Sequence, residues 1–336
     1  MNLFKALCLV LLLISQAAYA GKTFDAIKKR GEIKCGVTTG IPGFSVPDSK
    51  GKWTGIDVDV CRAVAAAMFG NPEKVTFVPL SSQQRFTAIQ SGEVDLLSRV
   101  TTHTLSRDTS LGLNFAPVTY YDGQAFMVRK SDGIKSAKDL NGATVCVQQG
   151  TTTELGLADY FRANRMKFKS VVYEANDEVA QAFVKKRCDA FTTDASGLAA
   201  ERTRFKNPSQ YIILPEVISK EPLAPAVRHG DDKWFDIVKW TVYALLEAEE
   251  MGMTSSNVDG FKKSKDPNIK RFLGVTKGNG KALGLSETWA YNIVKKVGNY
   301  SEIFEKNIGK KTSLKLERGL NALWKDGGIM YAPPLR

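Results

Sequence analysis

Strand-like and helix-like segments alternate along this 336-residue chain, and the alternation occurs twice. In the first series, the predicted strands 32–37, 74–79 and 94–97 are separated by predicted helices at 57–69, which Asp57 can cap, and at 82–90. An extended stretch follows, and the series starts again with strands at 143–148, 171–174 and 189–193. Strands that alternate with helices of this size form βαβ units and a mostly parallel sheet. The pattern therefore predicts an α/β fold with two sheets.

The first twenty residues have the three parts of a secretory signal peptide. Lys5 precedes an apolar run over residues 6–14, and Ala18 and Ala20 are small residues at the two positions that matter for cleavage. The run is too short to span a bilayer. Cys8 lies inside it, upstream of the cleavage position, so no lipid-anchoring cysteine is evident. We expect residues 1–20 to be removed near Ala20 and the protein to be exported.

Chain length and charge narrow the class further. The chain without its signal peptide exceeds what one hydrophobic core usually serves, so two domains are expected. The net charge is +12, but the basic residues are scattered, and no basic run is longer than three residues. An exported chain without a concentrated basic patch is not expected to bind nucleic acid. With only His103 and His229 as histidines, no metal site and no cofactor are expected.

Four cysteines follow the signal peptide, and an even number permits disulfides in an oxidising compartment. They are Cys35, Cys61, Cys146 and Cys188, and no C-x-x-C spacing occurs. The pairings Cys35–Cys61 and Cys146–Cys188 would each stay inside one domain. Four buried free thiols remain the alternative.

The most informative loop is residues 98–108, Ser-Arg-Val-Thr-Thr-His-Thr-Leu-Ser-Arg-Asp, directly after the predicted strand 94–97. In open α/β sheets, ligands bind just beyond the carboxyl ends of the strands. The loop holds five hydroxyl side chains and two arginines, Arg99 and Arg107. The alternative is a polar loop that only caps a strand.

Two later segments occupy equivalent positions. Residues 149–154, Gln-Gly-Thr-Thr-Thr-Glu, follow strand 143–148 and open a helix, and Thr151 with Glu154 forms a capping-box pattern. A helix N-terminus after a strand can bind an anion. Asp194 ends strand 189–193, although it could equally be the N-cap of the next helix.

Together, these segments match the charges of an α-amino acid. Arg107 and the backbone N–H groups of both loops suit a carboxylate, which an arginine fork binds with two parallel hydrogen bonds. Asp194 and the threonine hydroxyls suit an ammonium group. A small molecule that carries both groups is an amino-acid zwitterion.

The same segments resemble the polar amino-acid solute-binding proteins of ABC importers, and most closely the general L-amino-acid-binding type of Gram-negative bacteria. The resemblance covers essentially the whole chain after the signal peptide. It is carried by residues 55–60 (Gly-Ile-Asp-Val-Asp-Val), 98–108, 149–154, 192–194 (Thr-Thr-Asp), 316–320 (Leu-Glu-Arg-Gly-Leu) and 324–331 (Trp-Lys-Asp-Gly-Gly-Ile-Met-Tyr).

This resemblance implies a periplasmic-binding-protein-like type II fold. Two α/β lobes would be joined by two hinge strands, near residues 120–124 and 219–226, with an extra helical C-terminal extension. The first lobe would comprise residues 21–121 and return at 223–336 with the extension, and the second lobe would comprise 122–222. Helices are predicted in the returning part at 234–251, 287–297, 301–307 and 316–325.

The resemblance also implies a set of ligand-binding residues. The arginine that clamps the ligand carboxylate falls on Arg107, the backbone donors on Thr102 and Thr152, and the ammonium-binding carboxylate on Asp194. Thr101, Thr151 and Gln149 belong to the same loops and are expected to contribute. Arg99 either favours acidic or amide side chains of the ligand or forms a structural salt bridge.

Four positions bear on ligand preference. Val100 and His103 depart from the general L-amino-acid-binding subgroup, and the role of His103 stays open. Relatives that prefer basic amino acids place aromatic residues on both sides of the ligand. The corresponding residues here are Ile41 and Ser82, so a dedicated lysine or arginine site is not expected.

The implied function is that of a periplasmic binding protein that closes around a polar L-amino acid. The protein would deliver its ligand to membrane-embedded ABC permease subunits and act as a monomer. The rival is a dehydratase-like enzyme on the same bilobal fold that acts on a small carboxylate. Such an enzyme needs a positioned acid or base at the cleft, for which His103 or Asp194 would have to serve.

Overall fold

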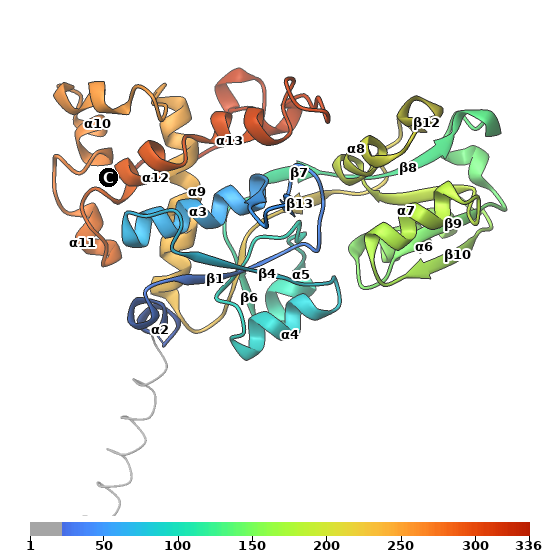
Figure 1. The fold of residues 1–336 in the computed structure, drawn as a ribbon, viewed down its shortest axis with the longest axis horizontal. Coiled ribbons are helices and arrows are strands. Elements are labelled where there is room, and N and C mark those ends of the chain that lie inside the picture. The colour runs from blue at the N-terminus through green and yellow to red at the C-terminus, as the bar shows by residue number, and fades with distance from the viewer. Residues whose placement is uncertain (1–21) are drawn as a thin grey trace, which may run out of the picture.

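The computed structural model describes residues 22–336, which form two α/β lobes connected by a pair of extended strands (Figure 1). The predicted signal peptide, with Cys8, lies outside the described residues. Within residues 22–336, no helix has the length and apolar character needed to cross a membrane.

The first lobe contains a five-stranded sheet in the order β4-β1-β5-β14-β6. β1 pairs in parallel with β4 and β5, whereas β14 runs antiparallel to β5 and β6. The mostly parallel sheet predicted from the alternation is thus present, and β14 is the one strand of this sheet that runs against the other four. The strands are β1 (Ile33–Val37), β4 (Val75–Pro79), β5 (Leu96–Leu97), β6 (Leu113–Phe115) and β14 (Ala226–Arg228).

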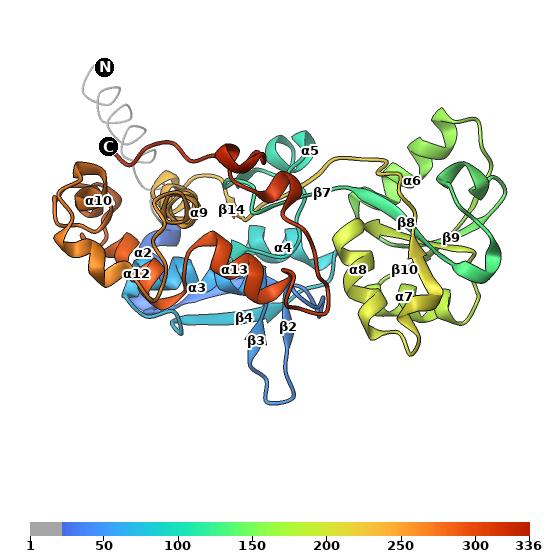
Figure 2. The same ribbon diagram turned by 90° about the horizontal axis from the view of Figure 1, so that it is seen from above.

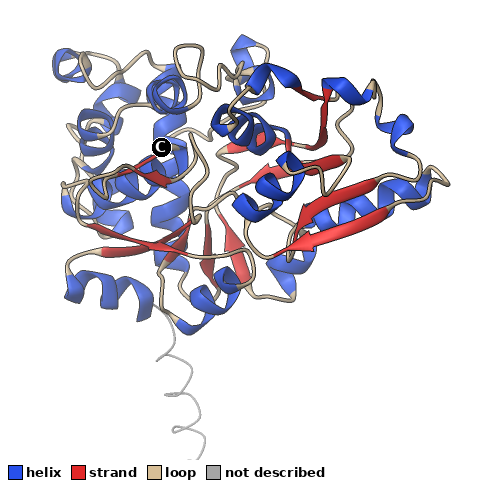
Figure 3. Cartoon of the chain, turned by 45° about the vertical axis from the view of Figure 1, so that its right-hand side comes forward, coloured by secondary structure: helices blue, strands red, loops and turns tan. Residues whose placement is uncertain are grey.

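Helices cover both faces of this sheet, as Figure 3 shows. The two residues of β5 illustrate why: Leu96 packs into the apolar cluster of α3, and Leu97 packs into the cluster of α4 on the opposite face. Successive strand residues point to opposite faces, so a strand buried on both sides needs apolar residues at every position. The helices of this part are α2 (Lys22–Arg30), α3 (Ile56–Phe69), α4 (Gln84–Ser91) and α5 (Leu105–Thr109).

The second lobe repeats this architecture with the strand order β10-β9-β11-β8-β12. α7 and α8 pack on one face and α6 on the other. The strands are β8 (Gln124–Arg129), β9 (Thr144–Gln148), β10 (Lys169–Tyr173), β11 (Ala190–Asp194) and β12 (Tyr211–Ile213). The helices are α6 (Thr152–Ala163), α7 (Asn176–Val184) and α8 (Ala195–Arg204), with short 3-10 turns η1 (Lys130–Asp132), η2 (Ala137–Leu140) and η3 (Pro208–Gln210).

The two lobes are joined by β7 (Tyr120–Asp122) and β13 (Glu221–Leu223), which pair antiparallel with Glu221 opposite Asp122. These are the hinge strands that the sequence predicts near 120–124 and 219–226. The predicted lobe boundaries, after residues 121 and 222, fall inside them. A small hairpin, β2 (Val46–Pro47) and β3 (Trp53–Thr54), projects from the first lobe (Figure 2).

The returning chain forms the helical extension on the first lobe. Its long helix α9 (Asp232–Glu250) and the helices after it pack with α3 around one apolar cluster that includes Trp289, Tyr300 and Phe304. The extension expected from the sequence is therefore present. Its other elements are η4 (Val258–Lys263), α10 (Pro267–Phe272), α11 (Asn279–Leu283), α12 (Trp289–Lys296) and α13 (Tyr300–Asn307).

The helix predicted at 316–325 is wrong. This segment contains only two 3-10 turns, η5 (Gly319–Asn321) and η6 (Trp324–Asp326). The physical reason is a tertiary contact: the side chain of Asn321 accepts from the Tyr121 N–H at 2.6 Å and donates to the Tyr121 carbonyl at 3.1 Å. Gly319, with φ of 47°, interrupts the helical backbone two residues earlier. The segment thus follows the hinge strand instead of its own helical propensity.

Both predicted disulfides are present, so the alternative of free thiols is wrong. Cys35 of β1 is bonded to Cys61 of α3, and Cys146 of β9 is bonded to Cys188, which precedes β11. Each bridge fixes a strand of the sheet to an element packed against or beside it, within one lobe.

We predict that each disulfide stabilises its lobe by reducing the number of conformations open to the unfolded chain. The bridges close loops of 26 and 42 residues, for which loop-closure entropy gives roughly 3.5 and 4 kcal/mol. In urea unfolding, the paired substitutions Cys35→Ala/Cys61→Ala and Cys146→Ala/Cys188→Ala should each lower the midpoint, the second by more. Unfolding of the unsubstituted protein under reducing conditions is the control and should show both losses. Unchanged midpoints would contradict the prediction.

Candidate ligand-binding site

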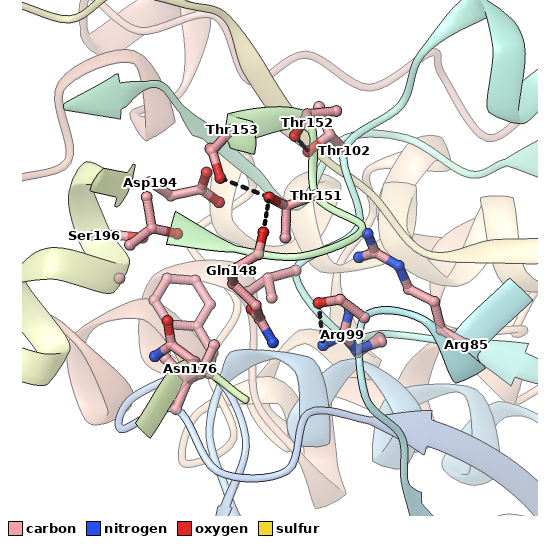
Figure 4. Close-up of a pocket in the computed structure, with 16 residues that line it drawn as sticks. Arg85, Arg99, Thr102, Gln148, Thr151, Thr152, Thr153, Asn176, Asp194 and Ser196 are labelled. Atoms are coloured by element: carbon pink, nitrogen blue, oxygen red, sulfur yellow. Dashed lines mark hydrogen bonds between the residues drawn. The ribbon is translucent and has the colours of Figure 1, made fainter. Parts of the chain in front are cut away.

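A cavity lies between the lobes, beside the ends of the parallel strands of both sheets (Figure 4). The first lobe contributes residues from the loop after β5 and from the start of α4. The second lobe contributes residues from the ends of β9 and β11 and the first turns of the following helices. The lining residues are Ile41, Phe44, Ser82, Arg85, Arg99, Val100, Thr102, Gln148, Thr151, Thr152, Thr153, Asn176, Thr193, Asp194, Ser196 and Gly197.

The loop after β5 is held by a buried carboxylate from α3. Asp57 accepts hydrogen bonds from the Ser98 hydroxyl and from the Val100 N–H, both at 3.1 Å. Val100 has a φ of 43°, a left-handed conformation that is unfavourable for a β-branched residue. Burial raises the pKa of Asp57 to about 6, against the lowering effect of these hydrogen bonds. The prediction that Asp57 caps α3 is wrong: Gly55 occupies the N-cap, and Asp57 positions the site loop instead.

The second-lobe loop is shaped by the start of α6. Thr151 is the N-cap and accepts from the Glu154 N–H at 3.1 Å, as the capping pattern predicts. The Glu154 carboxylate, however, accepts from the Gly150 N–H at 2.9 Å. The first N–H groups of a helix have no partner within the helix. The N-terminus of α6, which is the positive end of the helix dipole, therefore points toward the cavity.

Asp194 stands at the N-cap position of α8 but makes no capping hydrogen bond with its side chain. The capping role considered for it is therefore wrong, and the carboxylate lies at the cavity instead (Figure 4). Burial raises the pKa of Asp194 well above its ordinary value, and the nearby carboxylates of Asp122 and Glu221 raise it further. Burial also raises the pKa of Asp122, to about 6, although Ser196 and Gly123 donate hydrogen bonds to it.

Three buried arginines gather near the opposite side of the cavity. Arg107 donates to the Thr102 carbonyl at 2.8 Å, and Arg85 donates to the Gly150 carbonyl at 3.2 Å. Arg99 has Nη2 3.5 Å from the Ser82 hydroxyl, but its Nε and Nη1 atoms are buried without a hydrogen-bond partner, as is Arg85 Nε. Within residues 22–336, none of the three forms an ion pair.

Burial disfavours the charge on each of these guanidinium groups. It lowers the pKa of Arg99 and of Arg107 to about 10. The pKa of Arg85 is lowered well below its usual value by burial and by the neighbouring Arg99 and Arg107. An anion placed among them would relieve both the missing hydrogen bonds and the mutual repulsion. The cavity is thus electrically polarised, with Arg85 and Arg99 on one side and Asp194 on the other (Figure 4).

Residues 33–310 match the family model of bacterial extracellular solute-binding proteins, family 3. The chain belongs to this family. A general L-amino acid-binding periplasmic protein of Rhizobium johnstonii is 57% identical over 97% of this chain and 96% of its own length. A glutamate/glutamine/aspartate/asparagine-binding protein of Rhodobacter capsulatus is 53% identical over 96% of each chain.

Solved structures agree with this assignment. An ABC transporter periplasmic binding protein from Brucella ovis with glutathione bound has a TM-score of 0.92 and 54% sequence identity, and the match covers 94% of this chain and 99% of that one. An ancestral amino acid-binding protein, described as a precursor of cyclohexadienyl dehydratase, has a TM-score of 0.58 and 31% identity, over 68% of this chain and 94% of that one. The type II bilobal fold is shared with such binding proteins.

Of the eight ligand-binding residues predicted for this family-3 protein, five line the cavity: Arg99, Thr102, Thr151, Thr152 and Asp194. Arg107 is buried behind Thr102, close enough to interact electrostatically with Asp194 and Glu221. Thr101 is buried away from the cavity, with its hydroxyl donating to the Arg99 carbonyl at 3.3 Å.

The remaining predicted residues lie elsewhere. Gln149 is exposed, and its neighbour Gln148 lines the cavity instead. His103 stacks on Phe115, with ring centroids 4.4 Å apart, and borders a separate surface groove with Tyr331. The two positions considered for ligand preference, Ile41 and Ser82, both line the cavity.

The cavity residues that were not predicted from the sequence include Arg85, Gln148 and Asn176. For Arg85 a signal was available: it precedes Ala88 and Ile89, the buried residues of α4, by three and four positions. An arginine on the buried face of a short helix is unusual and indicates a hydrogen-bond or charge partner in a neighbouring element. For Gln148 and Asn176, nothing local separates a cavity residue from an ordinary polar residue at an element end.

We predict that Asp57 holds the loop after β5 in place through its hydrogen bonds. Its burial lowers the stability of the folded protein only when the carboxyl group is ionised. Asp57→Ala should lower the free energy of unfolding by about 1–3 kcal/mol because the Val100 N–H loses its acceptor. Asp57→Asn keeps an acceptor and should be milder.

The sign of the pH dependence follows from the raised pKa. The folded protein binds a proton at Asp57 more tightly than the unfolded chain, so stability falls as the pH rises from about 4 to 6. As the pH is raised through this window, the free energy of unfolding of Asp57→Asn, measured with denaturant, should therefore rise relative to that of the unsubstituted protein. A constant difference between pH 4 and pH 7 would contradict the assignment.

Proposed function

We propose that this protein binds polar L-amino acids in the cavity between its lobes and delivers them to an ABC permease. The observation that carries the proposal is the polarised cavity, with the buried arginines Arg85 and Arg99 on one side and the half-buried carboxylate of Asp194 on the other. An amino-acid zwitterion carries the two complementary charges a few ångströms apart. The relatives from Rhizobium johnstonii and Rhodobacter capsulatus, named for amino-acid binding, support the same class of ligand.

In this proposal, the ligand carboxylate lies at the start of α6 and near Arg107. The N-terminal N–H groups of α6 and the backbone at Thr102 supply the hydrogen bonds. Arg107 fixes the Thr102 carbonyl and contributes its charge from behind the loop. Asp194 binds the ammonium group from the second lobe. Since each lobe supplies only part of these partners, and a buried unpaired charge costs several kcal/mol, a closed cleft is required.

The magnitude of binding supports closure as well. A micromolar dissociation constant corresponds to about −8 kcal/mol. An amino acid such as glutamate spreads this over roughly ten heavy atoms, about −0.8 kcal/mol per atom, which is roughly half of the limit of about −1.5 for the best small ligands and well above the roughly −0.3 of drug-sized ones. Nearly every polar atom of the ligand must then have a partner, so both lobes must contact it.

The ligand side chain is proposed to extend toward Arg99 and Arg85. The unpartnered Arg99 Nε and Nη1 and Arg85 Nε favour a side chain that accepts hydrogen bonds, such as a carboxylate or an amide. The same positive charges disfavour lysine and arginine as ligands. This matches the absence of an aromatic pair at the matching positions, Ile41 and Ser82.

The enzyme alternative has less support. A dehydratase would need an acid or base directed at the ligand, and His103 lies in a different groove. Asp194 remains as a candidate base, and the fold occurs in an ancestral protein described as a dehydratase precursor. We propose that the protein is a binder without catalytic activity or cofactor. Recovering bound amino acids unchanged after long incubation would support this, whereas conversion would refute it.

We further propose a periplasmic location after removal of residues 1–20, a monomeric state, and lobe boundaries at 21–121 with 223–336 and at 122–222. The periplasmic binding proteins among the relatives support the location. Mass spectrometry of the secreted protein would give the cleavage position.

We predict that Arg107→Ala and Asp194→Ala each weaken amino-acid binding at least a hundredfold, which is about 2.7 kcal/mol. Titration calorimetry measures the loss. The matched controls are Arg162→Ala and Asp159→Ala, an exposed pair on α6 in the same protein, 3.4 Å from each other. Both controls should bind like the unsubstituted protein. Unchanged affinity in either cavity variant would refute the proposed site.

A thermal-shift screen over the twenty L-amino acids, with D-isomers as controls, tests the ligand class. Polar L-amino acids should raise the midpoint as a group, and lysine and arginine should not. In Arg99→Gln, glutamate and aspartate should lose more affinity than glutamine and asparagine because only the acids need the charge. A single responding amino acid would refute broad specificity, and equal losses would refute the role of Arg99.

A further inference from the structure

The hinge strand β13 carries a buried carboxylate that is hydrogen-bonded to both lobes at the cleft. Glu221 is 2% exposed and lies opposite Asp122 of the other hinge strand. Its Oε2 accepts from the Thr102 hydroxyl of the first-lobe loop and from the Thr152 hydroxyl at the start of α6, each at 2.7 Å. Its Oε1 accepts from the Ser219 hydroxyl at 2.6 Å. One side chain thus gathers a residue from each lobe and from the hinge segment.

Two arginines lie near this carboxylate without a direct ion pair, since Arg107 and Arg85 both interact electrostatically with Glu221. Glu221 has no ion pair within residues 22–336. Its electrostatic neighbours also include two half-buried acids, Asp122 and Asp194. Burying a charge without an opposite charge is costly unless hydrogen bonds satisfy it. The three hydroxyls do so here, and a ligand cation in the cavity would reduce the remaining repulsion among the acids.

These hydrogen bonds fix the direction of the two threonine hydroxyls. A hydroxyl has one hydrogen to donate and lone pairs to accept with. Thr102 and Thr152 both direct that hydrogen to Glu221, so toward the cavity each offers only lone pairs. They can therefore accept from an ammonium group but cannot donate to a carboxylate. Since both residues line the cavity, they would join Asp194 in binding the ammonium.

We infer that Glu221 is a positioning residue that couples ammonium binding to lobe closure. It orients Thr102 and Thr152 as acceptors for the ligand ammonium and bridges the two lobes through them, whose hydroxyl oxygens are 3.3 Å apart. The inference concerning the ligand rests on the proposed binding of amino acids. The bridging of the lobes does not depend on the ligand and is tested separately.

Calorimetry with L-glutamate or another responding amino acid tests the orientation of the hydroxyls. Glu221→Gln keeps the shape but must present an amide N–H₂ in place of one acceptor oxygen, and we expect at least a tenfold loss of affinity. Thr152→Val removes one hydroxyl at constant size. If Glu221 acts through this hydroxyl, combining Glu221→Gln with Thr152→Val should add little to the loss. The affinity of the double variant should then lie within about threefold of the weaker-binding single variant. Losses that multiply, or a change below twofold in Glu221→Gln, overturn the inference.

Glu216→Gln is the matched control. Glu216 lies five residues earlier and accepts from the Ser136 hydroxyl at 2.6 Å, outside the cavity. Glu216→Gln removes the same charge as Glu221→Gln. Unchanged affinity in Glu216→Gln would therefore show that the loss in Glu221→Gln arises from the position of Glu221. Equal losses in Glu216→Gln and Glu221→Gln would attribute the effect to overall charge and overturn the inference.

A distance measurement tests the bridge without any ligand. Spin labels on cysteines introduced at the exposed Lys50 and Lys138, one in each lobe, report the separation of the lobes. We expect Glu221→Gln to shift the distribution of the free protein toward longer distances, with Glu216→Gln unchanged. An unaltered distribution overturns the bridging role. If the unsubstituted protein binds no amino acid, the proposed function fails, and the distances still decide the role of Glu221.

Discussion

The central constraint on this protein is that the charges buried between its lobes are not neutralised in pairs by the chain. Arg85, Arg99 and Arg107 are desolvated without an ion pair among the described residues, and Asp122 and Asp194 have raised pKa values for the same reason. Such groups are tolerated in a folded protein only when hydrogen bonds and a complementary partner compensate for the lost water. The two lobes are stable around their own apolar clusters, so the polar cleft can be optimised for a ligand.

The fold was predictable because its signals are local. Apolar runs such as 94–97 and the periodic helices between them are read within a few residues, and the two series give two sheets. The predicted helix at 316–325 failed because Asn321 satisfies the backbone of Tyr121, about two hundred positions away in the chain. A contact of that range leaves no trace in the local pattern that helix prediction uses.

The loops that line the candidate site were predictable, and the side chains that contact these loops were less so. The loops after β5 and β9 and Asp194 were found because parallel strands end at one edge of a sheet. Asp57 was interpreted as a helix cap because an acid at a helix start usually is one, whereas its side chain accepts a hydrogen bond from the Val100 N–H in the loop after β5. Glu221 and Arg85 were missed, since their significance arises only when both lobes and the hinge are assembled.

The link between Asn321 and Tyr121 has a mechanical consequence. Tyr121 belongs to β7, where a change of lobe angle must alter the backbone, and both its N–H and its carbonyl are bonded to the C-terminal segment. Bending there must either break these two hydrogen bonds or carry the segment along. The segment exposes Trp324 and Tyr331, whose rings lie 5.8 Å apart. The C-terminal tail is thus coupled to the hinge by hydrogen bonds. The position of these two exposed rings would therefore change with the degree of lobe closure.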